Sequence, residues 1–191
     1  NAGLTVQQPQ TRAYPAVPER GEGGGLRLSL ADVIQARNAI SGVVARAPLV
    51  PSLHMSARLG HEFLLKLETT QPTGAFKLRG AVNAVSALAG EVAGATCCST
   101  GNHGRAVAFA ARSRGLRAVV CMSSLVPQAK VEGIRALGAE VRIVGRSQDE
   151  AHAESRRLAK EEGLVEISPF DDPRVIAGQG TIGLELLEDR P

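Results

Sequence analysis

One lysine of this chain stands at a predicted helix start, between an aromatic and an apolar residue. Residues 73–81 read TGAFKLRGA, so Lys77 follows Phe76 and precedes Leu78. Burial and the positive end of a helix both disfavour an ammonium group, and together they favour the neutral amine that attacks a carbonyl. Lys77 is therefore a candidate nucleophile. A lysine that covers an exposed first turn of a helix has the same local sequence, so this segment alone leaves that alternative open.

A second segment, residues 99–104, forms a polar turn that is predicted to bind an anion. It reads STGNHG, follows an apolar run over residues 95–98 and precedes the helical stretch RAVAFAA. Gly101 and Gly104 let the backbone bend and approach a ligand, and the free N–H groups of a helix start suit a carboxylate or a phosphate. The turn has neither the G-x-G-x-x-G pattern of a dinucleotide site nor the closing G-K-[ST] of a P-loop.

Several motifs of the chain occur together in the order found in one enzyme family. The pair formed by KLE at 66–68 and GAFKLRG at 74–80 resembles the lysine segment of the fold-type II pyridoxal-phosphate enzymes, and STGNHG resembles their asparagine loop. The matches continue with VP at 126–127, KV at 130–131, GAEV at 138–141, PFDDP at 169–173 and IAGQGTIG at 176–183. The resemblance covers roughly residues 28–188 and points to the branch of threonine/serine dehydratases and serine racemase. STGNHGRAVA at 99–108 and VRIVGRSQD at 141–149 look most like the hydroxyectoine-utilisation dehydratases.

The resemblance implies a fold, a cofactor and a set of site residues. The fold would be α/β and tryptophan synthase β-like, with parallel open sheets that carry helices on both faces. The cofactor would be pyridoxal 5′-phosphate, bound to Lys77 as a Schiff base, with Phe76 beside it and Asn102 hydrogen-bonded to its 3′-oxygen. The substrate carboxylate would be held by residues of the polar turn, namely Ser99, Thr100, Gly101 and His103.

The same resemblance implies a dehydratase, that is, an ammonia-lyase. Lys77, once displaced by the substrate amine, would remove the Cα proton, and loss of a β-hydroxyl would lead to a 2-oxo acid and ammonia. The substrate would be a β-hydroxy amino acid or an ectoine-derived amine. Gln179 would lie near the substrate, or GQG at 178–180 would form a packed helix bend, and His103 would mainly orient its loop.

Three alternatives remain: a racemase, a β-replacement synthase of the same fold, and a truncated binding module without turnover. Racemases of the family look to carry a serine where this chain has Thr100. A threonine is bulkier and stiffer at χ1, which favours elimination over racemisation. The family's chains run well past 191 residues, so the resemblance implies the front portion of an enzyme, with an incomplete large domain and without the glycine-rich phosphate loop. Such a portion could be inactive alone, and we expect a homodimer for a full-length protein.

The periodicity of the chain predicts alternating strands and helices. The predicted strands cover residues 63–67, 95–98, 118–122, 140–144 and 164–167; the predicted helices start at Ser29, near residue 78, after residue 104, near residue 130, at Ser147 and at Asp172. Ser29 with Asp32 and Ser147 with Glu150 form capping boxes. Repeated βα units predict a mostly parallel sheet with ligands at the carboxyl ends of its strands. Lys77 and the polar turn would share this rim of the sheet.

The domain organisation follows from these elements and from the resemblance. Residues 1–25 are rich in Pro, Gln and Gly and predict a flexible leader. Residues 26–75 would begin the large domain, 76–165 would form the small domain, and 166–191 would return to the large one. Among the charged residues of these segments, Arg79 is expected to form an ion pair or a cap, and Lys66 and Glu68 are expected to be simple strand-end charges.

Composition excludes several other classes of protein. The chain is 43% apolar and 21% charged, with 22 Lys and Arg against 19 Asp and Glu, a net charge of +3 and only 3% aromatic residues. This balance is typical of globular enzymes and lacks the signs of a nucleic-acid surface. No apolar run approaches the length of a membrane span and no signal peptide begins the sequence, so we expect no membrane partner and a cytoplasmic protein. Cys97, Cys98 and Cys121 lack C-x-x-C spacing and predict reduced thiols and no metal site.

Overall fold

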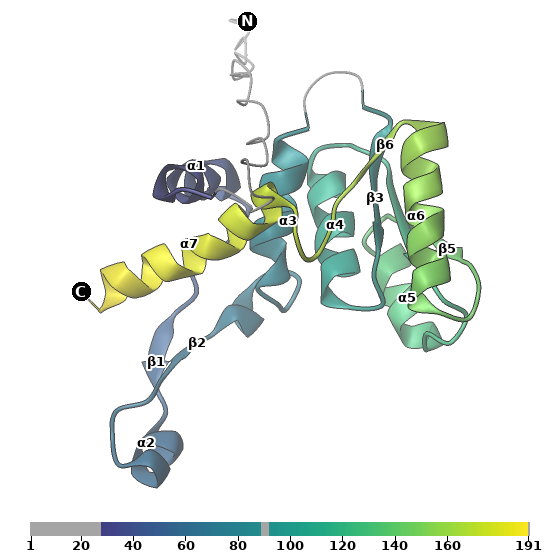
Figure 1. Ribbon diagram of the computed structural model, residues 1–191. Helices are drawn as coiled ribbons and strands as arrows, with labels where there is room; N and C mark the ends of the chain where they lie inside the picture. The colour runs from purple at the N-terminus through teal and green to yellow at the C-terminus, as the bar shows by residue number, and fades with distance from the viewer. Residues whose placement is uncertain (1–27, 89–91, 191) are drawn as a thin grey trace, which may run out of the picture.

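The computed structural model describes residues 28–88 and 92–190 (Figure 1). The predicted leader at 1–25 lies outside these residues. The helices are α1 (Leu30–Ile40), α2 (Leu53–Leu59), a 3₁₀ turn η1 (Glu68–Thr70), α3 (Lys77–Ser86), α4 (Asn102–Ser113), α5 (Gln128–Arg135), α6 (Gln148–Glu162) and α7 (Pro173–Asp189). The strands are β1 (Leu49–Pro51), β2 (Leu64–Lys66), β3 (Gly94–Cys98), β4 (Ala118–Met122), β5 (Glu140–Ile143) and β6 (Leu164–Glu166).

Four parallel strands form the main sheet, in the order β5-β4-β3-β6. β3 aligns Cys98 with Cys121 of β4 and Ala95 with Val165 of β6. Helix α6 contacts β3, β4 and β6, whereas α4 and α5 contact the strands from the other side, and Figure 1 shows the sheet between them. Both faces are covered, which explains why β3 and β4 are buried along their whole length. The predicted parallel sheet with helices on both faces is confirmed.

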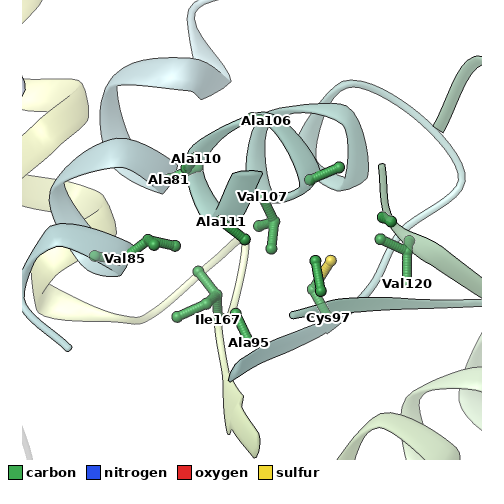
Figure 2. Close-up of a cluster of buried hydrophobic side chains, with 14 of the residues drawn as sticks. Ala81, Val85, Ala95, Cys97, Ala106, Val107, Ala110, Ala111, Val120 and Ile167 are labelled. Carbon is green, nitrogen blue, oxygen red and sulfur yellow. The ribbon is translucent and has the colours of Figure 1, made fainter. Parts of the chain in front are cut away.

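Small side chains form much of the core between the sheet and the helices α3 and α4 (Figure 2). Ala106, Ala110 and Ala111 of α4 are at most 1% exposed and lie close to α3, which presents Ala81 and Val85. Alanines at a helix contact let the two axes approach, so α3 is held firmly against α4. This contact ties the helix that carries Lys77 to the sheet.

The three cysteines are buried and free, as predicted. Burial raises the pKa of Cys97 well above its ordinary value, and it raises the pKa values of Cys98 and Cys121 to about 11. These thiols are therefore protonated, unreactive core residues at neutral pH.

Local caps begin the helices where the sequence predicts them. Ser29 and Asp32 form a capping box at α1, Ser147 and Glu150 form one at α6, and Asp172 accepts the Arg174 N–H at α7. The boundaries of several other predicted elements shift by a residue or more; for example, β2 covers Leu64–Lys66 instead of residues 63–67. In the part of the chain that the structure describes, no helix is both long and apolar enough to cross a membrane.

The elements β1, α2 and β2 form an arm that points away from the main sheet (Figure 1). β1 and β2 pair in antiparallel fashion, which departs from the predicted parallel arrangement. Sequence analysis also missed β1 and α2. Both are short, and α2 buries none of its residues, so neither has the apolar periodicity that reveals longer elements.

Candidate active site

Lys77 begins α3, directly after a turn at Gly74. Gly74 has a φ of +74°, which suits glycine, and its N–H donates to the Gln71 carbonyl at 2.7 Å. The half-buried Lys77 donates from Nζ to the Pro169 carbonyl at 3.2 Å, and the same Nζ lies 5.3 Å from the centre of the Phe76 ring. Among residues 28–88 and 92–190, no carboxylate forms an ion pair with this amine. The amine is thus held near the site without a fixed counter-charge.

The polar turn lies at the carboxyl end of β3 and is organised by Ser99. This side chain is buried, and its Oγ accepts the N–H groups of Gly101 at 3.3 Å and Gly104 at 3.0 Å. Helix α4 starts immediately afterwards, with Asn102 exposed in its first turn and no side-chain cap at Gly101. Gly104 is closely packed, because an added Cβ would lie 3.0 Å from Cγ1 of Val120.

His103 connects this turn to the segment that also contacts Lys77. Its Nε2 lies 2.9 Å from the Ile167 carbonyl, so Nε2 carries the proton and donates it. Burial lowers the pKa of His103, and the positive charge of Lys77 lowers it too, which keeps the ring neutral. Lys77 and His103 therefore both bond to backbone carbonyls of residues 167–169, and the polar turn and the lysine meet at one rim.

Two further polar side chains have buried atoms without a partner in the described structure. Thr73 is 2% exposed and its Oγ1 has no hydrogen bond. Gln179 of α7 accepts the Gly80 N–H on Oε1 at 3.3 Å, while its Nε2 stays unpaired. Gln179 therefore lies in the contact between α7 and α3, within a continuous helix. Sequence analysis did not single out Thr73, and no periodic signal marks a threonine in a turn.

A buried charged cluster lies two residues beyond Lys77. Arg79 is 1% exposed and pairs with Glu68 and Glu185, which confirms the predicted ion pair. The simple interpretation of Lys66 and Glu68 was wrong, because Lys66 Nζ lies 2.8 Å from Glu185 and Glu68 is a main partner of Arg79. Burial opposes ionisation of Glu185, but its bonds from Arg79 and Lys66 outweigh burial and lower its pKa.

The residues present fit a cofactor that carries an aldehyde and an anionic oxygen. The aldehyde requires an amine that is not locked to a carboxylate, and Lys77 meets this requirement. A ring beside the amine requires space, and an added Cβ at Gly74 or at Gly101 would meet no atom within 4 Å. In the portion of the chain that the structure describes, no group of three or more His, Cys, Asp and Glu side chains could hold a metal ion.

Residues 40–191 match the family described as pyridoxal-phosphate dependent enzyme. The chain belongs to this family. It is 52% identical over 166 residues to a putative threonine dehydratase of Sinorhizobium fredii, an alignment that covers 86% of this chain and 50% of the relative. It is 42% identical over 166 residues to the L-threonine ammonia-lyase of Thermotoga maritima, with 86% and 41% covered.

A serine racemase of known structure shares the fold. The structure of maize serine racemase matches with a TM-score of 0.82 and 36% identity, and the match covers 86% of this chain and 50% of the racemase. The predicted fold-type II α/β fold, related to threonine dehydratases and serine racemases, is thereby confirmed. The chain spans about half the length of the curated relatives it matches.

Proposed function

We propose that this chain provides the reactive lysine of a pyridoxal-phosphate-dependent ammonia-lyase. The substrate class is a β-hydroxy amino acid, or an ectoine-derived amine of the kind that the hydroxyectoine resemblance implies. One observation carries the proposal: the Lys77 amine and His103 of the polar turn bond to carbonyls two residues apart, those of Pro169 and Ile167. The names of the relatives, threonine dehydratase and L-threonine ammonia-lyase, support the same reaction class.

Three residues would hold the cofactor. Lys77 would bind the aldehyde carbon through Nζ, because this amine has no carboxylate partner among the described residues. Phe76 is 40% exposed beside the amine and would pack against the cofactor ring. Asn102, exposed in the first turn of α4, would bond to the ring oxygen. When bound, the cofactor supplies an electron sink for cleavage of the Cα–H bond.

The polar turn would bind the substrate carboxylate. Ser99 Oγ already accepts two backbone N–H groups, and no acceptor for its own hydroxyl proton lies among the residues described, so this proton is available to a carboxylate. Thr100 and His103 would add their N–H groups at the start of α4, where the helix dipole favours an anion. Gly101, whose N–H is held by Ser99, would let the carboxylate approach the backbone closely, because it has no side chain. The neutral His103 ring would orient the turn through its bond to Ile167. Gln179 would contact the substrate through its Nε2, which has no partner among the described residues.

Lys77 would then act as the base of the reaction. Its neutral amine would take the Cα proton and pass it to the β-hydroxyl, which would then leave as water. Later addition of water would release a 2-oxo acid and ammonia. The positive charge that Lys77 gains has an acceptor at hand in the Pro169 carbonyl. No other described residue is needed as a general base.

A racemase is the second candidate, favoured by the structural match to maize serine racemase. Racemisation requires a second proton donor on the opposite face of Cα, and Thr100 is bulkier than the serine that the family resemblance expects there. The elimination reaction requires no such donor. A β-replacement synthase would require an added nucleophile, and a binding module would carry out no Cα chemistry.

Incubation with pyridoxal phosphate and L-serine or L-threonine in D₂O separates these candidates. The lyase predicts equal amounts of 2-oxo acid and ammonia, abolished by Lys77→Ala and retained in Lys130→Ala, whose lysine is exposed on α5. Formation of the D-enantiomer without 2-oxo acid would identify a racemase instead. Absence of 2-oxo acid, of D-enantiomer and of deuterium at Cα of the recovered substrate would leave only the binding module.

A further inference from the structure

The buried arginine that follows Lys77 has contacts far beyond those of an ordinary ion pair. We propose that Arg79 is a positioning residue for Lys77: through Glu68 and Glu185 it fixes the first turn of α3 and hence the place of the amine. The proposal rests on the proposed role of Lys77 as the cofactor-binding amine. Lys77 and Arg79 are the first and third residues of α3, so their side chains leave the helix about 200° apart.

Arg79 is bonded on every side of its guanidinium group. Nε and Nη2 donate to the two Glu68 carboxylate oxygens at 2.9 and 2.7 Å. Nη1 and Nη2 donate to the two Glu185 oxygens at 2.7 and 3.0 Å, and Nη1 also donates to Thr181 Oγ1 at 3.1 Å. Because each carboxylate contact is bidentate, the planar guanidinium group of Arg79 can adopt only one orientation.

Each acidic partner of Arg79 is itself held by other residues. Glu68 accepts from Gln71 Nε2 at 3.2 Å, and Gln71 in turn bonds to both backbone groups of Ala45. Glu185 lies 2.8 Å from Lys66 Nζ, on the neighbouring strand β2. The cluster therefore joins α3 to α7, to η1, to β2 and to the loop before β1.

Close backbone packing fixes the same helix along its axis. An added Cβ at Gly80 would lie 2.6 Å from the Val175 carbonyl, and one at Gly178 would lie 2.6 Å from the Arg79 carbonyl. The distance between α3 and α7 is thus set by backbone contact, whereas the rotation of α3 is set by Arg79. On another side of the helix, Lys77 Nζ donates to the Pro169 carbonyl and lies 5.3 Å from the centre of the half-exposed Phe76 ring.

A buried charged cluster contributes little net free energy to folding. Burying such ions is costly, and apolar replacements of similar volume are often equally stable. Directional bonds do supply an orientation that apolar packing lacks, and reactive groups need placement within about 0.5 Å. A misplacement of about 1 Å reduces reaction rates by on the order of a hundredfold. The cluster is therefore best explained by the position of Lys77, not by the free energy of folding.

The test measures how selectively pyridoxal phosphate labels Lys77. The chain is treated with the cofactor and borohydride, and mass spectrometry gives the ratio of adduct on Lys77 to adduct on the exposed Lys130 and Lys160. Arg79→Lys keeps a positive charge but loses the planar guanidinium group that makes both bidentate carboxylate contacts. The combined variant Glu68→Gln, Arg79→Met, Glu185→Gln removes the charges of Arg79 and of its two carboxylate partners and leaves Lys66 paired with Asp189.

We expect the labelling ratio to fall about tenfold or more in both variants, at temperatures where circular dichroism shows each to be folded. The matched control is Arg117→Lys. Arg117 also makes a bidentate contact with a carboxylate, because its Nε and Nη2 donate to the two oxygens of Glu140 at 2.7 and 3.0 Å, but it bonds to no residue of α3. Its ratio should equal that of the unchanged chain.

The outcomes separate the two proposals. If the unchanged chain shows no preference for Lys77, the proposed cofactor role fails, and the positioning role fails with it. If the preference exists and the folded combined variant keeps it, Arg79 serves stability alone and the positioning proposal is overturned. Should Arg79→Lys not fold, the combined variant decides, because it leaves no buried charge of this trio unpaired.

Discussion

The amine of Lys77 donates a hydrogen bond to the backbone carbonyl of Pro169, 92 residues further along the chain, at 3.2 Å. The segment that follows β6 thus provides the resting contact of the candidate reactive group. A carbonyl holds an amine without a permanent negative charge, and a hydrogen bond to a charged donor contributes only about 1.5–3 kcal/mol. The amine can therefore leave Pro169 for a carbonyl ligand, which a buried ion pair would have prevented.

Gly80→Ala should destabilise the chain by about 1–3 kcal/mol, because its new Cβ would lie 2.6 Å from the Val175 carbonyl and overpacked sites cost that much. The measurement is the free energy of unfolding from urea titration. Gly183→Ala is the matched control on α7, since nothing lies within 4 Å of its added Cβ. Alanine should there stabilise the helix by up to about 1 kcal/mol. Equal stability of the two variants would contradict the close α3–α7 contact.

Ser99→Ala should destabilise the polar turn, because the N–H groups of Gly101 and Gly104 would lose their common acceptor. Loss of a partner for a buried donor costs about 1–3 kcal/mol. Hydrogen exchange at Gly101 and Gly104 should accelerate as well. The control is Ser113→Ala, whose hydroxyl donates only to the Ala110 carbonyl at the end of α4. Unchanged exchange at Gly104 in Ser99→Ala would argue against this organisation of the turn.

His103 should make stability depend on pH below about 6.5, its ordinary pKa. Burial lowers the pKa of His103 in the folded chain, so the unfolded chain binds the proton first. The free energy of unfolding should therefore fall as pH drops from about 6.5 through the lower folded value. Glu185, whose pKa is also lowered, acts only below its ordinary 4.5. His103→Gln, which can still donate to Ile167, should flatten the dependence between pH 7 and 5 by comparison with His54→Gln on the exposed α2. Parallel pH curves for the two variants would contradict the buried neutral ring.

Thr100→Ser should increase racemisation relative to elimination if the chain performs the proposed chemistry. The smaller, freer hydroxyl is better able to deliver a proton to the opposite face of Cα. Chiral chromatography of residual serine, together with the yield of 2-oxo acid, gives the ratio. Thr70→Ser changes a threonine of η1, which is exposed, and should leave the ratio unaltered. A ratio that is the same in Thr100→Ser and Thr70→Ser would remove Thr100 from any role in choosing the reaction.

Local signals in the sequence predicted the elements that carry the site. The strand at 118–122 was predicted residue for residue, because a short apolar run bounded by polar residues is typical of a strand buried on both faces. The caps at Ser29, Ser147 and Asp172 were predicted because a cap is a contact between residues two or three positions apart.

Long-range contacts escaped sequence analysis because their partners lie far apart in the chain. Arg79 is 11 residues from Glu68 and 106 from Glu185, so no local pattern pairs them. One signal was available on α7: the buried stripe of Val175 and Gly178 continues through Thr181 and Glu185 at helical spacing. A carboxylate on a buried stripe needs a buried cation, and that requirement would have pointed to Arg79 or Lys66. The family resemblance, and not a local pattern, assigned roles to Ser99, Asn102 and His103.

The most direct test of the central claim is a visible absorption titration of the chain with pyridoxal phosphate. We predict a new absorption band and, after borohydride reduction, an adduct on the peptide that contains Lys77. Both should disappear in Lys77→Ala and persist in Lys130→Ala, whose lysine is exposed on α5. An equal band and an equal adduct yield in Lys77→Ala would contradict the assignment of Lys77 as the cofactor-binding lysine.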